Sequence, residues 1–365
     1  MGKRVIISGG GTGGHIFPAV AIANALKRIE PDIEILFVGA TGRMEMEKVP
    51  AAGYRIIGLD IQGFQRKSWI KNLMLPYKIL MSLIKARGII KDFKPDVAVG
   101  VGGYASGPLL YSASWMKIPY LIQEQNSYAG ITNKKLGKNA QKICVAFEDM
   151  DRFFPAEKIL ITGNPIRKEA VDIMDKKNAA ADFFELSPLK KTILVTGGSL
   201  GAGTLNSSMM SGMDKIIAAD VQLIWQTGKY YYPSITELLA GKEHANIKVR
   251  EFLQRMDLAY ACADLIISRA GAGTIAELYL VKKPVILVPS PNVAEDHQTK
   301  NAMALVKNEA AVLVKDSDAR DDLVDIALQL IKNEHRSISL SKNIGRMAFP
   351  HADEVIAREV LKIAN

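Results

Sequence analysis

The sequence predicts an α/β protein in which two doubly wound, Rossmann-like domains face each other across a cleft. Short apolar runs alternate with helical patterns, which is typical of a parallel sheet with helices on both faces. At two places, residues 5–15 and 192–203, an apolar strand runs into a glycine turn that opens a helix. The 365 residues also exceed one ordinary domain. Because such sheets bind ligands at the carboxyl ends of their strands, we expect each domain to hold one substrate.

The first half should alternate between strand and helix from its beginning, with a long helical tract between the third and fourth strands. The expected strands are 4–8, 33–38, 56–59, 97–101, 120–123 and 142–145, and the expected helices are 17–29, 43–51 and 108–116. The second half repeats the alternation and becomes mostly helical after Leu313.

The domain junction is expected near Gly163 and Asn164, where a turn-forming Gly-Asn-Pro sequence precedes a polar stretch. Residues 1–163 then form the first domain, joined by the C-terminal helix at about 343–365. Residues 164–342 form the second domain.

Composition excludes several classes of protein. Cys144 and Cys262 lie far apart without a CxxC or His-rich companion, which argues against disulfides and zinc and fits a reducing cytoplasm. No apolar segment of signal-peptide length opens the chain. The uncharged stretch 97–116 is rich in glycine, so it is expected to form a strand, a loop and a helix rather than a membrane span.

The net charge of +9 suits anionic lipid, nucleic acid or phosphorylated substrates. Nucleic acid is not expected, because no recognition pattern accompanies the charge. Residues 61–91 contain no acid and interleave Lys and Arg with apolar side chains, as in segments that lie on an anionic membrane surface. The alternative is a core helix with a solvated basic face. The residues expected to contact the membrane are Trp69, Lys71, Leu75, Lys78 and Ile79.

The first glycine loop, residues 9–15, ends in His15. Its backbone N–H groups and the following helix dipole are suited to a diphosphate, and His15 is placed to act as a general base. The spacing also matches the dinucleotide fingerprint, but Gly39 and Ala40 stand where that motif needs an acid. Nicotinamide binding is therefore not expected. The alternative for His15 is a plain residue of a helix N-terminus.

The second domain carries a similar turn at residues 268–274, where backbone N–H groups and the Thr274 hydroxyl can hold phosphate oxygens. Glu277 can accept hydrogen bonds from both hydroxyls of a ribose, and its alternative role is to stabilise the helix dipole. Gln298 and Asn301 can bind sugar hydroxyls, although turns use the same residue types. No Walker lysine follows these loops, and we see no Asp-x-Asp pair of the kind that holds a metal against a nucleotide diphosphate. We therefore expect protein groups rather than a metal or another cofactor to neutralise the leaving phosphate.

Seven motifs, in matching order over nearly the whole chain, closely resemble the MurG family. They are 9–15, 102–104, 123–126, 162–167, 197–199, 269–277 and 296–302. Members of this family are membrane-associated UDP-N-acetylglucosamine transferases that convert lipid I into lipid II in peptidoglycan synthesis. The resemblance implies a GT-B fold, with the acceptor lipid on the amino-terminal half and the UDP-sugar on the carboxy-terminal half.

The resemblance also implies site residues and partners. The implied donor-binding residues are Thr12, Gly13, Gly14, Asn126, Arg167, Ser199, Leu253, Ala272, Gly273, Thr274, Glu277, Gln298 and Asn301, with Leu253 contacting uracil through its backbone. Those implied for the acceptor diphosphate are Gly11, Gly14, Gly103 and Tyr104. The implied partners are UDP-GlcNAc, undecaprenyl-linked lipid I, the cytoplasmic face of the inner membrane, bound peripherally, and cell-wall synthesis proteins.

Two positions depart from the family pattern. Leu200 stands where relatives often have glutamine, and Gln123 where many have histidine. A catalytic imidazole at residue 123 is thereby excluded, which strengthens His15 as the base. Three rival functions stay open: a glycolipid synthase that uses diacylglycerol, a UDP-GlcNAc 2-epimerase, and a noncatalytic nucleotide-sugar-binding protein.

Overall fold

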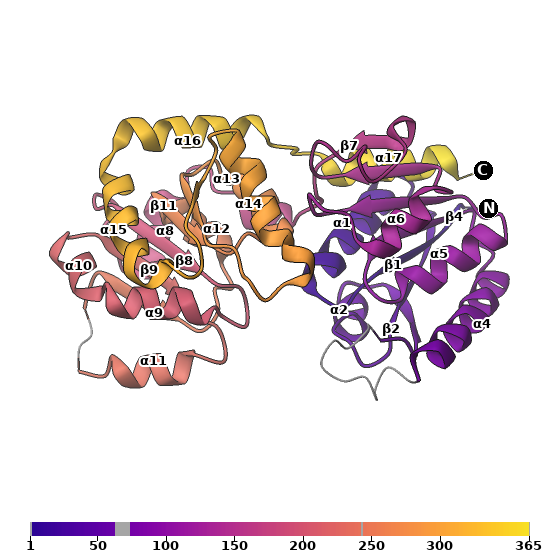
Figure 1. The fold of residues 1–365 in the computed structure, drawn as a ribbon, viewed down its shortest axis with the longest axis horizontal. Coiled ribbons are helices and arrows are strands. Elements are labelled where there is room, and N and C mark those ends of the chain that lie inside the picture. The colour runs from indigo at the N-terminus through magenta and orange to yellow at the C-terminus, as the bar shows by residue number, and fades with distance from the viewer. Residues whose placement is uncertain (1, 63–73, 242–243, 365) are drawn as a thin grey trace. The chain divides into compact units, whose positions relative to one another are not determined.

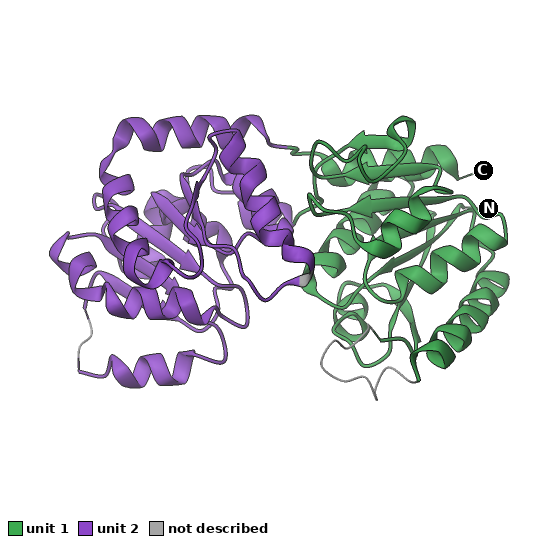
Figure 2. Cartoon of the chain, in the orientation of Figure 1, with its two compact units in different colours: residues 1–166, 349–365 green, residues 167–348 purple. Residues whose placement is uncertain are grey.

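The computed structural model describes residues 2–62, 74–241 and 244–364 (Figure 1). The chain folds into two compact units (Figure 2). Unit 1 comprises residues 1–166 and 349–365, and unit 2 comprises residues 167–348. The division falls at Arg167, shortly after the junction expected near Asn164. No helix among the described residues is long and apolar enough to cross a membrane.

Unit 1 contains a seven-stranded parallel sheet in the order β3-β2-β1-β4-β5-β6-β7. The strands are β1 (Arg4–Gly9), β2 (Glu34–Ala40), β3 (Arg55–Leu59), β4 (Val97–Gly102), β5 (Tyr120–Glu124), β6 (Lys142–Val145) and β7 (Ile159–Ile161). The helices are α1 (Gly13–Ile29), α2 (Glu45–Ala51), α4 (Leu75–Phe93), α5 (Ser106–Trp115), α6 (Ile131–Gly137) and α17 (Ala352–Ile363), with a 3-10 turn η1 (Ala156–Lys158).

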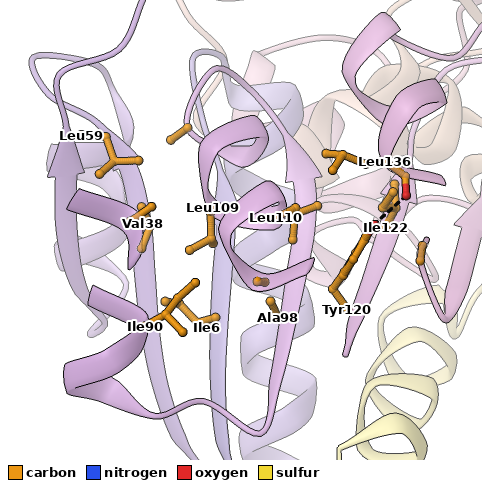
Figure 3. Packing of buried hydrophobic residues seen from close by; sticks show 14 of the residues in the cluster. Ile6, Val38, Leu59, Ile90, Ala98, Leu109, Leu110, Tyr120, Ile122 and Leu136 are labelled. Carbon is orange, nitrogen blue, oxygen red and sulfur yellow. Dashed lines mark hydrogen bonds between the residues drawn. The ribbon is translucent and has the colours of Figure 1, made fainter. Parts of the chain in front are cut away.

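Helices cover both faces of this sheet. Successive side chains of a strand point to opposite faces, so neighbouring residues of one strand enter different cores. Ile6 of β1 belongs to a core that includes residues of α4 and α5, whereas its neighbours Val5 and Ile7 belong to a core shared with α1 and α17. Figure 3 shows the first core, in which Ile90 of α4 lies near Ile6. Strands buried on both faces explain the continuous apolar runs of the sequence.

The C-terminal helix α17 belongs to unit 1 because it packs on α1. Ile356 and Val360 are fully buried in the core that they share with α1. An ion pair between Arg28 and Asp353 at 2.6 Å adds to this contact. The helix expected at 343–365 is two helices, since α16 ends at Arg346 and α17 begins only after Pro350. A proline in a helix interior removes a hydrogen bond and clashes with the preceding turn.

Unit 2 contains a six-stranded parallel sheet in the order β10-β9-β8-β11-β12-β13. Its strands are β8 (Thr192–Thr196), β9 (Gln222–Gln226), β10 (Ile247–Arg250), β11 (Leu265–Ser268), β12 (Val285–Leu287) and β13 (Val312–Leu313). Its helices are α7 (Lys168–Val171), α8 (Lys177–Phe184), α9 (Gly203–Ser211), α10 (Met213–Ala218), α11 (Tyr232–Leu238), α12 (Met256–Cys262), α13 (Ala272–Val281), α14 (His297–Lys307), α15 (Ala319–Lys332) and α16 (Glu334–Arg346), with a 3-10 turn η2 (Ala294–Asp296).

The predicted fold class of two doubly wound parallel sheets is confirmed. Helix α1 also differs from its expected bounds, because it begins at Gly13 rather than at residue 17. Glycine has low helix propensity, so the sequence pattern favours a loop through Gly13 and Gly14. In the fold both glycines lie in the first helical turn, whose early N–H groups have no acceptor within a helix.

Candidate active site

In both units the glycine turns follow the two strands between which the strand order reverses. Unit 1 reverses between β1 and β4, and unit 2 reverses between β8 and β11. The turns at 9–15 and 102–104 follow the first pair, and those at 197–199 and 269–274 follow the second. The place where the strand order reverses is called the switch point, and doubly wound sheets bind ligands there. Each unit therefore has one candidate ligand site, built from two turns that are distant in sequence.

In unit 1 the imidazole of His15 is held between the two turns. Its Nδ1 lies 3.0 Å from the carbonyl oxygen of Gly10. A carbonyl can only accept, so Nδ1 carries the proton and, in the neutral ring, Nε2 carries the lone pair. The ring also packs against Gly102, where an added Cβ would lie 2.6 Å from His15 Cδ2. These two contacts fix the orientation of the His15 ring.

The turn at residues 102–104, which follows β4, packs against the turn at residues 9–15. Gly103 has a φ of 91°, and a Cβ on it would overlap the backbone of Gly10. Only glycine allows both this backbone conformation and this approach. Tyr104 is exposed, lies near Gly11, and its ring is 5.9 Å from the guanidinium carbon of Arg43.

The amide of Gly11, which the sequence assigned to the acceptor diphosphate, donates instead to a protein group. Its N–H bonds Glu45 Oε2 at 2.8 Å. The assignment of a phosphate contact to this amide is therefore corrected. The early amides of α1, from Gly13 and Gly14, are the donors that the helix geometry directs outward at this turn.

Glu124 holds the segment 123–126 in place through buried hydrogen bonds, a role that the sequence does not reveal. The Glu124 carboxylate is buried and accepts hydrogen bonds from the amides of Asn126 at 3.1 Å and Gly130 at 3.2 Å, and from Asn133 Nδ2 at 2.8 Å. Burial raises its pKa, and these hydrogen bonds oppose the rise. Glu124 thereby positions Asn126. Gln123 is buried as well and donates to Asn164 Oδ1 at 2.8 Å.

In unit 2 the predicted phosphate cradle is the first turn of α13. Ala272, Gly273 and Thr274 are its first three residues, and none of them is fully buried. Amides in the first turn of a helix point out of its N-terminus, which is where helices bind anions. Ser199 is exposed at the neighbouring turn, whose Gly198 carbonyl accepts from Gln226 Nε2 at 2.9 Å.

Glu277 lies further along α13, with its side chain 17% exposed. Its Oε2 accepts from the hydroxyl of Tyr260 at 2.9 Å, and its Oε1 lies 3.9 Å from Arg167. Burial raises the pKa of Glu277, while Tyr260 and Arg167 act in the opposite direction. Tyr260 is fully buried and was not found from the sequence, because its partner lies on another helix. The structure thus brings the predicted Arg167 and Glu277 together.

Three other predicted donor residues have different outcomes. Asn301 is 0% exposed, and its Nδ2 donates to the Ala270 carbonyl at 3.3 Å. This burial corrects its predicted contact with sugar hydroxyls, because Asn301 braces the turn before α13 from behind. The amide of Leu253 donates to Gln226 Oε1 at 2.9 Å, so a backbone contact with a base would use the Leu253 carbonyl. Gln298 is half-buried, and its Oε1 accepts from the Ser290 amide at 2.9 Å.

Comparisons with known proteins agree with this architecture. Residues 5–145 match the glycosyltransferase family 28 N-terminal domain, and residues 192–356 match the corresponding C-terminal domain. A Parabacteroides distasonis protein, the UDP-N-acetylglucosamine–N-acetylmuramyl-(pentapeptide) pyrophosphoryl-undecaprenol N-acetylglucosamine transferase, is 57% identical over 99% of this chain and 98% of its own. The crystal structure of Acinetobacter baumannii MurG is 28% identical, with a TM-score of 0.79 over 99% of both chains.

The two family 28 domain matches, together with the fold of two doubly wound sheets, define a glycosyltransferase of the GT-B class. The fold alone does not separate it from an epimerase. A Neisseria meningitidis UDP-GlcNAc 2-epimerase bound to UDP-GlcNAc has a TM-score of 0.68, at 16% identity over 99% of this chain and 100% of its own. Sequence identity over the full length does separate them, and the chain belongs to the MurG family of N-acetylglucosamine transferases.

Proposed function

We propose that this protein transfers GlcNAc from UDP-GlcNAc to the C4 hydroxyl of lipid-linked MurNAc-pentapeptide, lipid I, forming lipid II. The observation that carries the proposal is the 57% identity, over 99% of the chain, to a transferase named for this lipid-linked acceptor. The two glycine-rich switch points support it, because the reaction brings together two diphosphates, one on each substrate.

The acceptor belongs to unit 1 in this proposal. Gly14, in the first turn of α1, holds its diphosphate with Gly103 and Tyr104 at the neighbouring turn. Thr12 and Gly13 lie beside them and contact the sugar that the donor transfers. His15 Nε2 takes the proton of the C4 hydroxyl as the oxygen attacks the anomeric carbon. The bond from that carbon to the UDP oxygen breaks on the opposite face, which inverts the configuration and gives a β-1,4 linkage. A general base of this kind contributes about 100- to 10,000-fold to the rate.

The donor belongs to unit 2. Glu277 accepts the ribose hydroxyls, and the amides of residues 272–274 with the Thr274 hydroxyl bind the diphosphate. Ser199 and Arg167 add a donor and a cation for the charge that develops on UDP. The Leu253 carbonyl contacts the uracil, and Gln298 and Asn126 are assigned to the sugar.

The proposal is tested by transfer of labelled GlcNAc from UDP-GlcNAc to a lipid I analogue, with UDP-glucose as competing donor. The expected product is a disaccharide lipid, formed in preference from UDP-GlcNAc. Each rival predicts another result. Diacylglycerol would be the better acceptor for a glycolipid synthase, an epimerase would turn over without any acceptor, and a noncatalytic binding protein would form no product.

Donor affinity should depend on pH through Glu277. Its carboxylate is the form that accepts two ribose hydroxyls, so affinity should fall as pH decreases through the Glu277 pKa. Because burial raises that pKa above the ordinary 4.5, the loss should begin at a higher pH than for an exposed glutamate. Titrations of UDP from pH 7 downward measure this effect, and Glu277→Gln should remove its part of the pH dependence.

The raised pKa of Glu277 affects the stability of the fold in the opposite direction with pH. A raised pKa means that the folded state binds the proton more tightly than the unfolded state does. The contribution of Glu277 to stability is therefore complete below its unfolded pKa of 4.5 and is lost as pH rises through the folded value. Weakened binding at low pH would thus reflect the site rather than unfolding caused by this residue.

Peripheral contact with the cytoplasmic membrane surface is part of the proposal, and α4 supports it. Ser82, Ala86 and Ile90 bury one face of this helix against unit 1. Tyr77, Leu80, Met81 and Ile84 form a second apolar group on the other side of the helix, where they are exposed, and Ile79 is exposed as well. Lys85, Arg87 and Lys91 are exposed on the same helix. Such a combination is suited to anionic headgroups above acyl chains.

The predicted membrane residues are placed unevenly. Ile79 is exposed, Leu75 is half-buried, and Lys78 pairs with Asp60 at 3.0 Å, which offsets its charge. Trp69 and Lys71 lie outside the described residues.

If α4 contacts the membrane, Leu80→Glu and Ile84→Glu should each weaken binding to vesicles. Each replacement should lower cosedimentation with phosphatidylglycerol vesicles about tenfold, because burying an apolar side chain of this size is worth about 1.5–3 kcal/mol. Transfer to a short-chain, water-soluble acceptor should be unchanged. Leu238→Glu is the matched control, because Leu238 is an exposed leucine of unit 2. Vesicle binding equal to that of the unaltered protein in both variants would contradict the proposed surface.

A further inference from the structure

The carboxylate of Glu45 lies beneath the first glycine loop and holds it. Glu45 is the first residue of α2 and is 1% exposed. Its two oxygens accept from two backbone amides, Oε2 from Gly11 at 2.8 Å and Oε1 from Ala40 at 2.9 Å. Gly11 lies in the loop after β1, and Ala40 ends β2. One buried side chain thus ties the catalytic loop to the neighbouring strand.

Two glycines leave the space that this side chain occupies. A Cβ on Gly10 would overlap Glu45 Oε1, and a Cβ on Gly39 would lie 2.6 Å from Glu45 Cγ. Gly10 therefore accommodates a protein carboxylate behind the loop rather than a ligand in front of it. Gly39 is the position where a dinucleotide-binding protein would carry its acid. In this chain the carboxylate at the end of the second strand comes from α2 and faces the loop.

The loop that Glu45 holds also fixes the orientation of the His15 imidazole. The Gly10 carbonyl bonds His15 Nδ1 at 3.0 Å, and the Gly10 amide donates to the Gly102 carbonyl at 3.3 Å. The peptide that joins Gly10 to Gly11 thus contributes its carbonyl to His15 and its N–H to Glu45. A rotation of this single peptide plane would break both contacts. The tautomer and the orientation of His15 therefore depend on the same plane that Glu45 holds.

We propose that Glu45 is a positioning residue for the transfer reaction. Its carboxylate locks the plane of the Gly10–Gly11 peptide, so that the Gly10 carbonyl keeps the proton of His15 on Nδ1 and the lone pair on Nε2. The inference rests on the proposed role of His15 as base. It assigns to Glu45 no contact with either substrate.

The test compares Glu45→Gln with Glu47→Gln. Glutamine keeps the volume of Glu45, but its NH2 group cannot accept, so one of the two backbone amides faces another donor. We expect kcat for transfer to a lipid I analogue to fall about tenfold or more, since a buried donor without its acceptor is costly. The affinity for UDP should stay within about twofold. Glu47 lies on the same helix with its side chain 77% exposed, and its replacement should leave kcat unchanged.

Two further readouts separate positioning from support of the fold. Hydrogen exchange should accelerate at residues 10–16 in Glu45→Gln while β1 and β4 keep their protection. In the His15→Ala background, Glu45→Gln should slow the reaction no further, because the group that it positions is gone. If Glu45→Gln does not fold, Glu45→Asp, which keeps the carboxylate on a shorter side chain, is measured in the same way.

Three results would overturn the inference: an unchanged kcat in Glu45→Gln, a loss that multiplies with that of His15→Ala, or faster exchange throughout unit 1. These results are distinct from failure of the proposed base. If His15→Ala keeps its full rate, the base is refuted whatever Glu45 does. If His15→Ala is slow but Glu45→Gln is not, the base stands and only the positioning role fails.

Discussion

Replacement of His15 by alanine is expected to lower kcat about 100- to 10,000-fold, which is the usual contribution of a general base. The acceptor hydroxyl would then attack without a group to take its proton. UDP affinity should be unchanged, because the residues assigned to UDP lie in unit 2 and His15 lies in unit 1. The measurements are single-turnover transfer of labelled GlcNAc to a lipid I analogue and a separate titration with UDP.

His351→Ala is the matched control for this experiment. His351 is an exposed histidine of the same unit, at the start of α17, so its loss should change neither rate nor affinity. A normal kcat in His15→Ala would remove His15 from the mechanism. An equal fall of kcat and of UDP affinity would instead indicate a damaged fold, and the thermal unfolding of the variant separates these outcomes.

Glu277→Ala is expected to weaken UDP binding about 10- to 100-fold and to raise the donor KM correspondingly. Hydrogen bonds to a charged group contribute about 1.5–3 kcal/mol, and a tenfold change corresponds to about 1.4 kcal/mol. At saturating donor, kcat should fall much less, since the ribose is remote from the reacting bond. Isothermal titration with UDP and steady-state kinetics with varied donor measure the two effects.

The buried hydroxyl of Tyr260 requires its own control. It donates to Glu277 at 2.9 Å and loses its acceptor in Glu277→Ala. Tyr260→Phe removes this internal hydrogen bond and leaves the carboxylate in place, so donor affinity should change by less than about threefold. Normal UDP affinity in Glu277→Ala would contradict the ribose role. Equal losses in both variants would assign the effect to packing of the helix.

The fold was largely predictable because its signals are local. Strands such as β1 and β8 are short apolar runs that end at glycines, and both lie at the centre of their sheets. Strands β7 and β13 at the sheet edges are shorter and only partly buried, so their sequences carry little pattern. The sequence pattern places the start of α1 too late, because helix propensity disfavours Gly13 and Gly14, whereas the structure has both in the first helical turn.

The sequence predicts the turn residues of the candidate site but not the buried residues that support these turns. The turns that follow strands at a switch point are recognisable in the sequence by their glycines, and His15 and Thr274 lie beside such glycines. Supporting residues such as Glu45 and Tyr260 carry no such signal, since Glu45 meets Gly11 from 34 residues away. The burial of Asn301 is not predictable for a related reason, because residue type does not show which face of a helix is buried.

The sequence by itself determined the class of protein and the order of its phosphate-binding turns. Both depend on apolar periodicity and on glycine spacing, which are properties of neighbouring residues. Only the tertiary structure decided which amides of those turns point outward and which are held by protein carboxylates. That choice depends on side chains such as Glu45 and Glu124, which reach the turns through the packing of separate elements, and no local pattern records those contacts.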